Sequence, residues 1–440
     1  MRVAVIGGGV TGVTAARTLH SLDSSIDVTV FDQGRGLGGR TSHRHVGSST
    51  SAVIISPAAA TSPESLRFDH GCQFFRADSF EFRSKILSGW LSSSAVAPWT
   101  PASGGDGDGD FFGLPSDPRP VYVGVGGFHS LTASLPPSVD VKQGVRVGGV
   151  ERAGAQWDVL GVSGPEAFHD TKASSAPAFK DSSGVESLGL FDVVLLTDAS
   201  QAQAGWHRAS AGLPPSFLSL ATRVTSRPRV ALFTALVCFA TPLATPLDCI
   251  SPASSSIIWF ASRTGSKPGV TAGTPCWTLV SRPSWAAGEI ERVPMRDPTT
   301  GAFIPQDPDY LQSVDGPAKQ MLAAFEACLG FALPSATFLT AQRWGSAMPA
   351  PANYAGGTVD VCGDTYATAH TLDLVLPEEG AGGGAGGGEE SGDDFVDGGD
   401  LNMHFAGDFC STKPPGVEAA ALSGYHAAER IVQRKRKQNM

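Results

Sequence analysis

Short runs of consecutive apolar residues predict a sheet of buried parallel strands near the start of the chain. Residues 2–6 form one run, Arg-Val-Ala-Val-Ile, and residues 27–31 form a second, Asp-Val-Thr-Val-Phe. Between them lie a glycine-rich turn and residues 13–22, whose Ala, Thr and Leu predict a helix. Strand, helix and strand in this order make a βαβ unit, which predicts a doubly wound α/β fold with a right-handed crossover.

The same pattern recurs later in the chain. Residues 191–197 and 403–406 read as further buried strands, and residues 417–430 predict a terminal helix. Residues 229–345 mix short strands with aromatic residues and one helix expected over residues 313–329. We therefore expect a discontinuous, Rossmann-type nucleotide-binding domain with an inserted α+β substrate domain, the former at residues 1–67, 136–228 and 346–440 and the latter at 68–135 and 229–345.

Three segments have compositions that cannot bury enough apolar surface to offset the entropy lost on ordering. They are rich in Ser and Ala or in Gly, Asp and Glu, and we expect flexible insertions at residues 47–63, 103–110 and 378–399. Residues 230–247 carry no charge and superficially resemble a membrane span. Because Pro242 and Pro246 interrupt the second half and Val, Phe and Thr dominate the first, we predict a buried strand followed by a loop.

Charge and cysteine content narrow the function classes. The 42 acidic and 32 basic residues give a formal net charge of −10, so a nucleic-acid partner is not expected. The seven cysteines contain no C-x-x-C pair, which argues against a disulfide framework and a metal site. A cytoplasmic protein is expected, or one of an organelle stroma if a transit peptide precedes this sequence. Membrane association is not expected, and the oligomeric state stays open.

The turn after the first predicted strand carries a dinucleotide-binding fingerprint. Residues 7–12 contain G-x-G-x-x-G between a strand and a helix, and Asp32 ends the next strand. The glycines allow a tight turn, a close approach of the backbone to a pyrophosphate and close helix packing, while N–H groups at the helix N-terminus face the anion. The Asp32 carboxylate would accept hydrogen bonds from the adenosine ribose. The residues assigned to the turn are Gly7, Gly9, Val10, Thr11 and Gly12.

FAD, NAD and NADP share this adenosine half, so the choice among them depends on other segments. Paired glycines in the loop after Asp32 let the chain pass close over a diphosphate, and arginines can bind its oxygens in bidentate fashion. We assign to this loop Gln33, Arg35, Gly38, Gly39 and Arg40.

A third segment near the C-terminus favours FAD. Gly407 and Asp408 end a predicted strand, and Asp408 could bind the ribityl chain of a flavin. A helix of small residues then begins, and its N-terminus could stabilise negative charge on the reduced flavin ring. The residues assigned to it are Gly416, Val417 and Glu418.

These segments together resemble the flavin-containing amine oxidase superfamily, and further stretches resemble its renalase-like branch. Those stretches are Phe-Asp-His-Gly-Cys-Gln-Phe-Phe at residues 68–75, residues 122–128, and Gln-Arg-Trp at residues 342–344. The resemblance spans most of the chain apart from the insertions. It implies non-covalent FAD, a strand-rich substrate domain above the flavin, molecular oxygen as electron acceptor, and an adenine contact from the backbone of Val147.

Hydride transfer to flavin N5 depends more on orientation and exclusion of water than on acid and base side chains. Gln73 and Trp344 are candidates for lining the flavin face with Arg343 close by, and ordinary packing would also explain each of them. Cys72, in the same loop as Gln73, is a candidate redox group or a small buried residue.

The leading interpretation is an oxidase of small reduced substrates, either dihydronicotinamide isomers or amines. One alternative is a desaturase or oxidase of a lipophilic substrate such as a carotenoid or porphyrin precursor. The other is a non-catalytic binding protein similar to the GDP-dissociation inhibitors.

Overall fold

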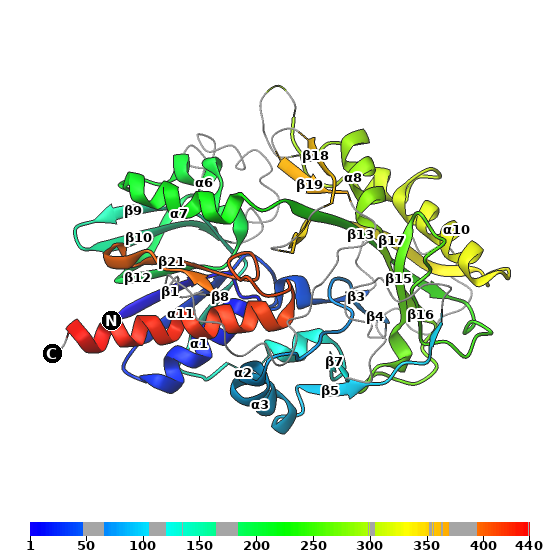
Figure 1. Ribbon diagram of the computed structural model, residues 1–440, viewed down its shortest axis with the longest axis horizontal. Helices are drawn as coiled ribbons and strands as arrows, with labels where there is room; N and C mark the ends of the chain where they lie inside the picture. Colours follow the sequence, from blue (N-terminus) through cyan, green and yellow to red (C-terminus); the bar gives the residue numbers. More distant parts are fainter. Residues whose placement is uncertain are drawn as a thin grey trace, which may run out of the picture.

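The computed structural model describes residues 1–46, 66–104, 120–133, 135–163, 184–297, 299, 304–351, 354, 356–361, 364–368, 394–438 and 440. Within this part of the chain two large sheets lie side by side, and the chain crosses between them several times (Figure 1). The predicted doubly wound α/β fold is confirmed.

The nucleotide-binding side is built on a six-stranded sheet. Its parallel strands come from the beginning, the middle and the end of the chain. The apolar runs predicted all of them except the largely exposed strand Asp140–Gln143. Only its edge strand β20 pairs in the antiparallel sense. The strand order is β20 (Phe395–Val396), β21 (Met403–Ala406), β12 (Val193–Leu196), β1 (Arg2–Ile6), β2 (Asp27–Asp32) and β8 (Asp140–Gln143).

Two helices from opposite ends of the chain cover one face of this sheet. They are α1 (Val10–Leu22) and α11 (Val417–Gln438), and they lie side by side in Figure 1. A Cβ atom on Gly424 would lie 2.2 Å from the carbonyl oxygen of Thr11, so the two helices approach closely only because α11 carries glycine there. Both helices are longer than the patterns predicted.

The other face is covered mainly by a three-stranded antiparallel sheet, where a doubly wound fold more often carries helices. Trp157 and Phe217 pack there against the large sheet and are fully buried. The covering elements are β9 (Val145–Ala153), β10 (Gln156–Ser163), β11 (Glu186–Phe191), α6 (Ala204–Ala209) and α7 (Pro215–Thr225).

The second sheet has eight strands. Its long central strand β13 is buried from Val230 to Phe239, which confirms the strand predicted at the start of residues 230–247. The other strands are β18 (Thr358–Val361), β19 (Asp364–Ala367), β16 (Cys276–Ser281), β15 (Ile258–Arg263), β14 (Cys249–Ile250), β6 (Ser103–Gly104) and β17 (Ala336–Pro349). None of the described helices is long and apolar enough to cross a membrane.

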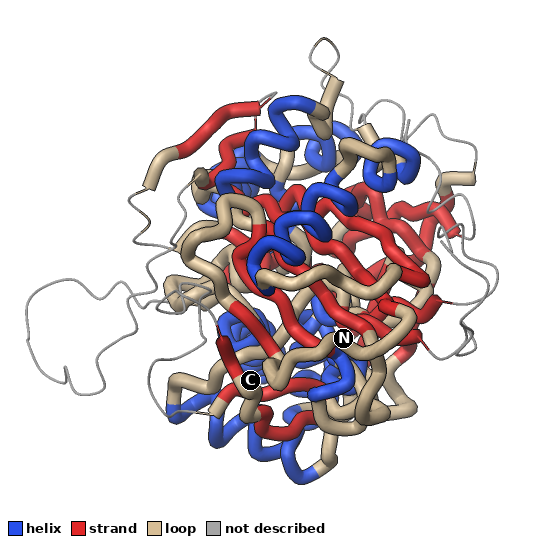
Figure 2. Tube along the Cα trace, turned by 90° about the vertical axis from the view of Figure 1, so that its right-hand side faces the viewer, coloured by secondary structure: helices blue, strands red, loops and turns tan. Residues whose placement is uncertain are grey.

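Helices lie across the outer face of this second sheet (Figure 2). They are α8 (Pro283–Arg292), α9 (Pro308–Gln312) and α10 (Pro317–Leu329). The single helix expected over residues 313–329 is therefore shorter, because Gly316 and Pro317 start α10 and a separate helix ends at Gln312.

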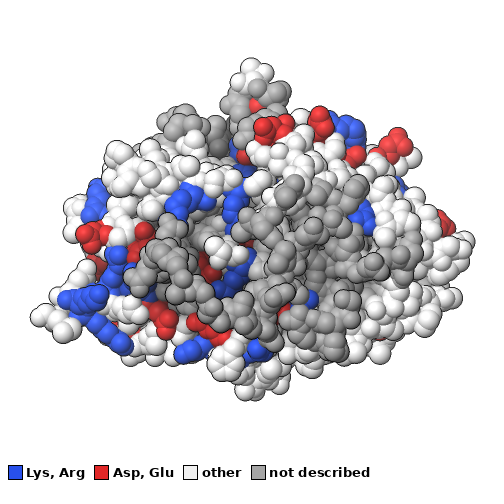
Figure 3. All heavy atoms as spheres, in the orientation of Figure 1, with Lys and Arg blue, Asp and Glu red and all other residues white. Residues whose placement is uncertain are grey.

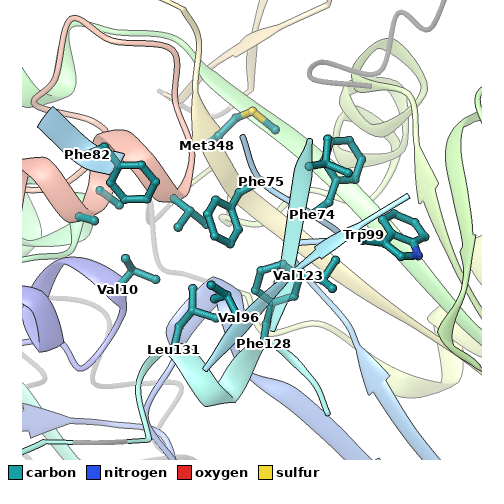
Figure 4. Close-up of a cluster of buried hydrophobic side chains, with 14 of the residues drawn as sticks. Val10, Phe74, Phe75, Phe82, Val96, Trp99, Val123, Phe128, Leu131 and Met348 are labelled. Atoms are coloured by element: carbon teal, nitrogen blue, oxygen red, sulfur yellow. The ribbon is translucent and has the colours of Figure 1, made fainter. Parts of the chain in front are cut away.

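A large apolar cluster joins the two sides of the molecule (Figure 4). It includes Val10 from α1 and Val417 from α11, together with aromatic residues such as Phe75 and Trp99. Short elements contribute to it: α2 (Phe80–Phe82), α3 (Ser88–Ser92), β5 (Val96–Trp99), β7 (Val121–Gly124) and the 3-10 helix η4 (Phe128–Leu131). The strands β3 (His43–Val46) and β4 (Leu66–Asp69) pack instead in a smaller cluster against the second sheet.

Three expectations from composition need correction. Residues 394–399, expected in a flexible insertion, begin with Asp394, Phe395 and Val396, which are buried because β20 completes the sheet edge. Residues 103–104 pair with β14. Strands β18 and β19, which the expected boundaries placed with the nucleotide-binding domain, instead extend the second sheet. Residues 47–63, 105–110 and 378–393 lie outside the described residues.

Candidate dinucleotide-binding site

The turn after β1 requires glycine at two positions. Gly7 has φ +112°, a region that strains residues with side chains. A Cβ atom on Gly12 would lie 1.9 Å from the carbonyl oxygen of Gly7, so α1 packs directly on the turn. At Gly9 only the carbonyl oxygen of Gly38, at 3.8 Å, lies within 4 Å of a Cβ position among the described residues. The turn is therefore closed toward the helix and open beside Gly9.

The carboxylate of Asp32 fixes both this turn and the loop that follows β2. Its Oδ2 accepts the N–H of Gly8 at 2.7 Å, and its Oδ1 accepts the N–H of Gly34 at 2.6 Å. Burial raises the pKa of Asp32, these two bonds oppose the increase, and the nearby Asp198 carboxylate adds to it. As the last residue of β2, Asp32 lies at the carboxyl edge of the parallel strands. Ligands of open α/β sheets bind at this edge.

The loop after β2 folds back over the glycine turn. Gly38 donates its N–H to the carbonyl oxygen of Gly8 at 2.8 Å. Gly38 and Gly39 have φ values of +133° and +54°, which turn the chain into the short 3-10 helix η1 (Gly39–Thr41). The paired glycines are therefore required by the backbone path, and they place Arg40 beside the turn.

Arg40 contacts the other end of the chain. Its guanidinium donates to Asp408 Oδ2 at 2.8 Å and Oδ1 at 2.7 Å, across a sequence separation of 368 residues. A third bond reaches the carbonyl oxygen of Ala347 at 3.0 Å. The Asp408 side chain is 1% exposed. Bidentate geometry of this kind is both strong and directional, so it fixes the two segments relative to each other.

The C-terminal segment is held in place by neighbouring side chains. Gly407 donates its N–H to Ser423 Oγ on α11 at 2.7 Å. Arg227, which precedes β13, donates to the carbonyl oxygen of Ser411 at 2.7 Å and to that of Ala350. Arg227 therefore connects the segment after β21 with the second sheet.

The two helix N-termini of the site are close together. Val10 and Thr11 form the first turn of α1 and Val417 begins α11; all three are buried, and the two valines belong to one apolar cluster. Gly416, just before α11, has φ +144°, and no described atom lies within 4 Å of its Cβ position. At both helix starts a valine side chain is buried, while the glycine just before the helix has space beside its backbone.

The Glu418 side chain binds the segment just before α2. Its carboxylate accepts the N–H groups of Asp78 at 2.6 Å and Ser79 at 2.9 Å, just before α2. Burial raises its pKa, and these bonds oppose the increase. The Glu418 side chain therefore fastens α2 to α11, and the role of Glu418 at the helix N-terminus facing a flavin stays a prediction.

The remaining assigned residues lie around this edge. Gln33 and Arg35 are exposed on the loop after β2. The N–H of Gly144, immediately before β9, donates to the carbonyl oxygen of Gly34 at 3.0 Å, which ties the start of β9 to the same loop. Val147 lies two residues into β9, partly buried. Its contact with adenine stays a prediction.

Of the three catalytic candidates, Trp344 lies beside the site. Its Nε1 donates to the carbonyl oxygen of His70 at 3.2 Å, and its ring stacks on the His70 ring with centroids 5.3 Å apart. A Cβ atom on Gly71 would lie 3.5 Å from the Trp344 ring and 2.2 Å from the carbonyl oxygen of Arg40. The loop of residues 70–71 therefore lies between Trp344 and Arg40.

Arg343 does not join the site. Adjacent residues of a strand point to opposite faces, and Arg343 lies on the helix-covered face of β17, where it donates to the carbonyl oxygen of Ile304 at 2.8 Å. Burial lowers its pKa, while Tyr366 and Tyr310 on the same face raise it. The structure thus places Arg343 on the face opposite Trp344, and its catalytic role stays a prediction that this placement does not favour.

Gln73 is a packing residue of the loop after β4. Its Nε2 donates to the carbonyl oxygens of Asp69 and Gly71, and its Oε1 accepts from Ser262 and Lys267. With both ends of the amide bonded within the protein, Gln73 has no group to offer a substrate. Its assignment to the flavin face stays a prediction.

Two further side chains of this loop are uncharged at neutral pH. Burial raises the pKa of Cys72 to about 12, and its thiol donates to the carbonyl oxygen of Phe74. Burial, with a smaller effect of Arg44, lowers the pKa of His70 to about 4. A protonated, buried thiol is a poor nucleophile, so Cys72 is better explained as a packing residue.

Sequence reasoning missed four residues of this region. Thr197 Oγ1 bonds the carbonyl oxygens of Ile6 and Gly7, and Asp198 follows it near Asp32. Their position after the buried run at residues 191–197 was a usable signal, because parallel strands end at one edge. No sequence pattern marked Arg227 or Lys267, because their partners, such as Ser411 and Asp69, are distant in the sequence.

The described residues around the site offer no metal-binding cluster. The surface charge is of mixed sign. No group of three or more potential ligands from His, Cys, Asp and Glu occurs among the described residues. Basic and acidic side chains are interspersed on the face seen in Figure 3.

Comparisons with known proteins agree with this geometry. A family model for an NAD(P)-binding Rossmann-like domain matches residues 5–85, which contain the glycine turn, Asp32 and Arg40. The crystal structure of a protein from Exiguobacterium sp. 255-15, provisionally named protoporphyrinogen oxidase, is similar to 98% of this chain over 99% of its own length. The TM-score is 0.54 and the sequence identity 12%. The chain therefore carries a Rossmann-like dinucleotide-binding domain and shares its overall fold with that protein.

Proposed function

We propose that this protein is an FAD-dependent oxidoreductase that takes a hydride from a small reduced substrate onto flavin N5 and passes the electrons to molecular oxygen. One observation supports FAD over NAD and NADP. The bidentate contact between Arg40 and Asp408 brings the C-terminal segment to the glycine turn, so residues for both halves of a long dinucleotide lie along one edge.

The residues present fit such a cofactor. Asp32 would bind the adenosine ribose, and the open backbone beside Gly9 at the start of α1 would approach the diphosphate. Arg40 would lie beside the diphosphate, and Asp408 beside the ribityl chain. The open backbone at Gly416 would leave the positive end of α11 facing the ring system. Bound FAD would supply the hydride-accepting ring.

The chain would contribute orientation and exclusion of water. Trp344 and the uncharged His70 form an aromatic wall next to Arg40, and the apolar cluster shown in Figure 4 closes the region between the two sheets. No acid or base is needed for hydride removal. The substrates that fit this scheme are dihydronicotinamide isomers or amines.

The test begins with the colour of the purified protein. We expect it to be yellow and to release FAD on denaturation, whereas Asp32→Ala should purify with much less FAD. Anaerobic mixing with each substrate class should bleach the flavin band, and air should restore it. A yellow protein that neither class bleaches would contradict the substrate class alone, and a colourless folded protein would contradict the whole proposal.

A second candidate is oxidation of a lipophilic porphyrin precursor. It is favoured by the name of the structurally similar protein and by the aromatic side chains of the central cluster, which suit a large apolar ligand. Bleaching by a porphyrinogen and not by dihydronicotinamides or amines would favour it. A colourless preparation that still binds a protein partner would favour a non-catalytic role.

A further inference from the structure

Two buried cysteines face each other across neighbouring strands of the second sheet. Cys238 on β13 is the registered partner of Cys276 on β16, at the last pair of that ladder. The two residues are 2% and 0% exposed, and both cysteines are free. Among the other cysteines of the described residues, Cys249 pairs with a serine, Ser262.

The hydrogen-bond pattern shows which kind of pair this is. Phe239 donates its N–H to the carbonyl oxygen of Pro275 at 3.0 Å, so residues 239 and 275 form a hydrogen-bonded pair. Hydrogen-bonded and non-hydrogen-bonded pairs alternate in an antiparallel ladder. Cys238 and Cys276 are therefore a non-hydrogen-bonded pair, whose Cα atoms are typically about 4.5 Å apart with their side chains close together. That separation lies within the range of about 4.4–6.8 Å that a disulfide spans.

We propose that Cys238 and Cys276 are an oxidisable dithiol that forms a reversible cross-strand disulfide when the protein meets a hydroperoxide. The proposal is independent of the proposed function, since it requires neither FAD nor substrate.

The surroundings determine which thiol reacts first. A hydrogen bond from the Cys276 thiol lowers the pKa of Cys238, and burial opposes this effect. The same contact and burial raise the pKa of Cys276. Elsewhere burial raises the pKa of Cys249 to about 12. Because the thiolate is the nucleophile, Cys238 is the attacking sulfur.

The chemistry balances with hydrogen peroxide as oxidant. The Cys238 thiolate attacks one peroxide oxygen, the O–O bond breaks, and hydroxide leaves as water after taking a proton, which gives a sulfenic acid. The Cys276 sulfur then attacks the sulfenic sulfur, an S–S bond forms, the S–O bond breaks, and a second water leaves with the Cys276 proton. Two thiols and one peroxide thus become one disulfide and two waters.

Access of peroxide to the pair requires local opening of the sheet. Cys238 and Cys276 are the last registered pair of the β13–β16 ladder, one residue inside the hydrogen bond between Phe239 and Pro275. Because both cysteines are buried, peroxide reaches them when this part of the sheet opens locally. The neighbouring side chains are apolar, including Leu66, Phe68 and Phe338, so reaction should be slower than at an exposed thiol.

The experiment uses the reduced full-length protein. After treatment with hydrogen peroxide and quenching, remaining thiols are alkylated in denaturant and the digest is mapped by mass spectrometry. We expect one cross-linked peptide pair containing Cys238 and Cys276, an intact mass lower by two hydrogen atoms, and reversal by dithiothreitol. The oxidised protein should also melt at a higher temperature than the reduced protein.

Matched variants separate this pair from general oxidation. Cys249→Ser, also in a buried strand, should retain the cross-link, while Cys238→Ser and Cys276→Ser should each lose it. If the folded wild-type protein keeps both thiols alkylatable after peroxide, or if Cys238 is oxidised further without cross-linking, the proposal is wrong. These readouts come from the wild-type chain, so a variant that fails to fold leaves the test intact.

Discussion

Arg40 and Asp408 illustrate how single residues define this site. Each was selected from sequence because of its neighbours: Arg40 follows paired glycines, and Asp408 ends a buried strand. The structure adds that they bind each other. By contrast, Gln73 and Arg343 were selected from motif resemblance alone, and a motif does not show which face of a strand a side chain occupies or which groups its amide already bonds. The face that a side chain occupies and the groups it bonds become known only when the pairing of the strands is known.

At the residue scale, Gly12→Ala should destabilise the protein and reduce cofactor content. The added methyl would lie 1.9 Å from the carbonyl oxygen of Gly7 and 3.1 Å from Val5 Cγ1, and overpacking of this kind costs about 1–3 kcal/mol. Gly36→Ala is the control, because no described atom lies within 4 Å of its Cβ position. Urea unfolding compares the two, and equal stability would show that α1 can shift away from the turn.

The buried ion pair of Lys267 and Asp69 gives a second residue-scale prediction. Their side chains are 2% and 5% exposed and 3.1 Å apart. Lys267→Met should cost about 3–5 kcal/mol in free energy of unfolding, because it leaves a buried carboxylate without its counter-charge. Adding Asp69→Asn should restore part of that loss, since the amide needs no counter-charge and can still accept the N–H of Phe128. Strictly additive losses in a double-mutant cycle would show that the two charges are not coupled.

At the scale of elements, the parallel strands were the most predictable part. Buried parallel strands are short continuous apolar runs, and the runs at residues 2–6 and 403–406 became β1 and β21 within the same limits. Composition failed at Phe395 and Val396, where two apolar residues at the end of a Gly-, Asp- and Glu-rich segment complete a sheet edge. So short a strand has too few residues to show a periodic pattern.

The stability that the contact between α2 and α11 gives the protein should depend on pH. His426 on α11 lies 2.9 Å from Glu81 on α2 and 3.3 Å from Asp394, which also binds Lys413. Its hydrogen bond to Asp394 is the main cause that raises the pKa of His426. A raised pKa means that the stabilisation is fully present below the unfolded value of about 6.5 and is lost as the pH rises through the folded value.

Melting temperatures of the wild type and of His426→Gln, measured from about pH 5.5 to about pH 8.5 around that unfolded value, test this prediction. The wild type should be the more stable at the acidic end, and the difference should shrink as the pH rises. A difference that is constant with pH would show that the imidazolium charge does not contribute.

At the scale of the whole molecule, the bound cofactor should contribute strongly to stability, since it would contact segments from both ends of the chain. Removing FAD should lower the melting temperature, and free FAD at 100 times its dissociation constant should restore about 2.7 kcal/mol. Differential scanning calorimetry of the apoprotein with and without FAD measures this effect. An Arg40→Ala/Asp408→Ala variant should show a smaller response, and an unchanged wild-type transition would argue against FAD as the ligand.

The packing of α11 on α1 has a consequence for synthesis. Helix α1 is synthesised long before Gly424 and the alanines of α11 that cover it. Domains whose contacts are local in sequence can fold while the chain is still growing. Here the first βαβ unit must wait for α11, so the nascent chain exposes an apolar face of α1 until α11 has been synthesised and is a natural client for chaperones that bind at the exit tunnel.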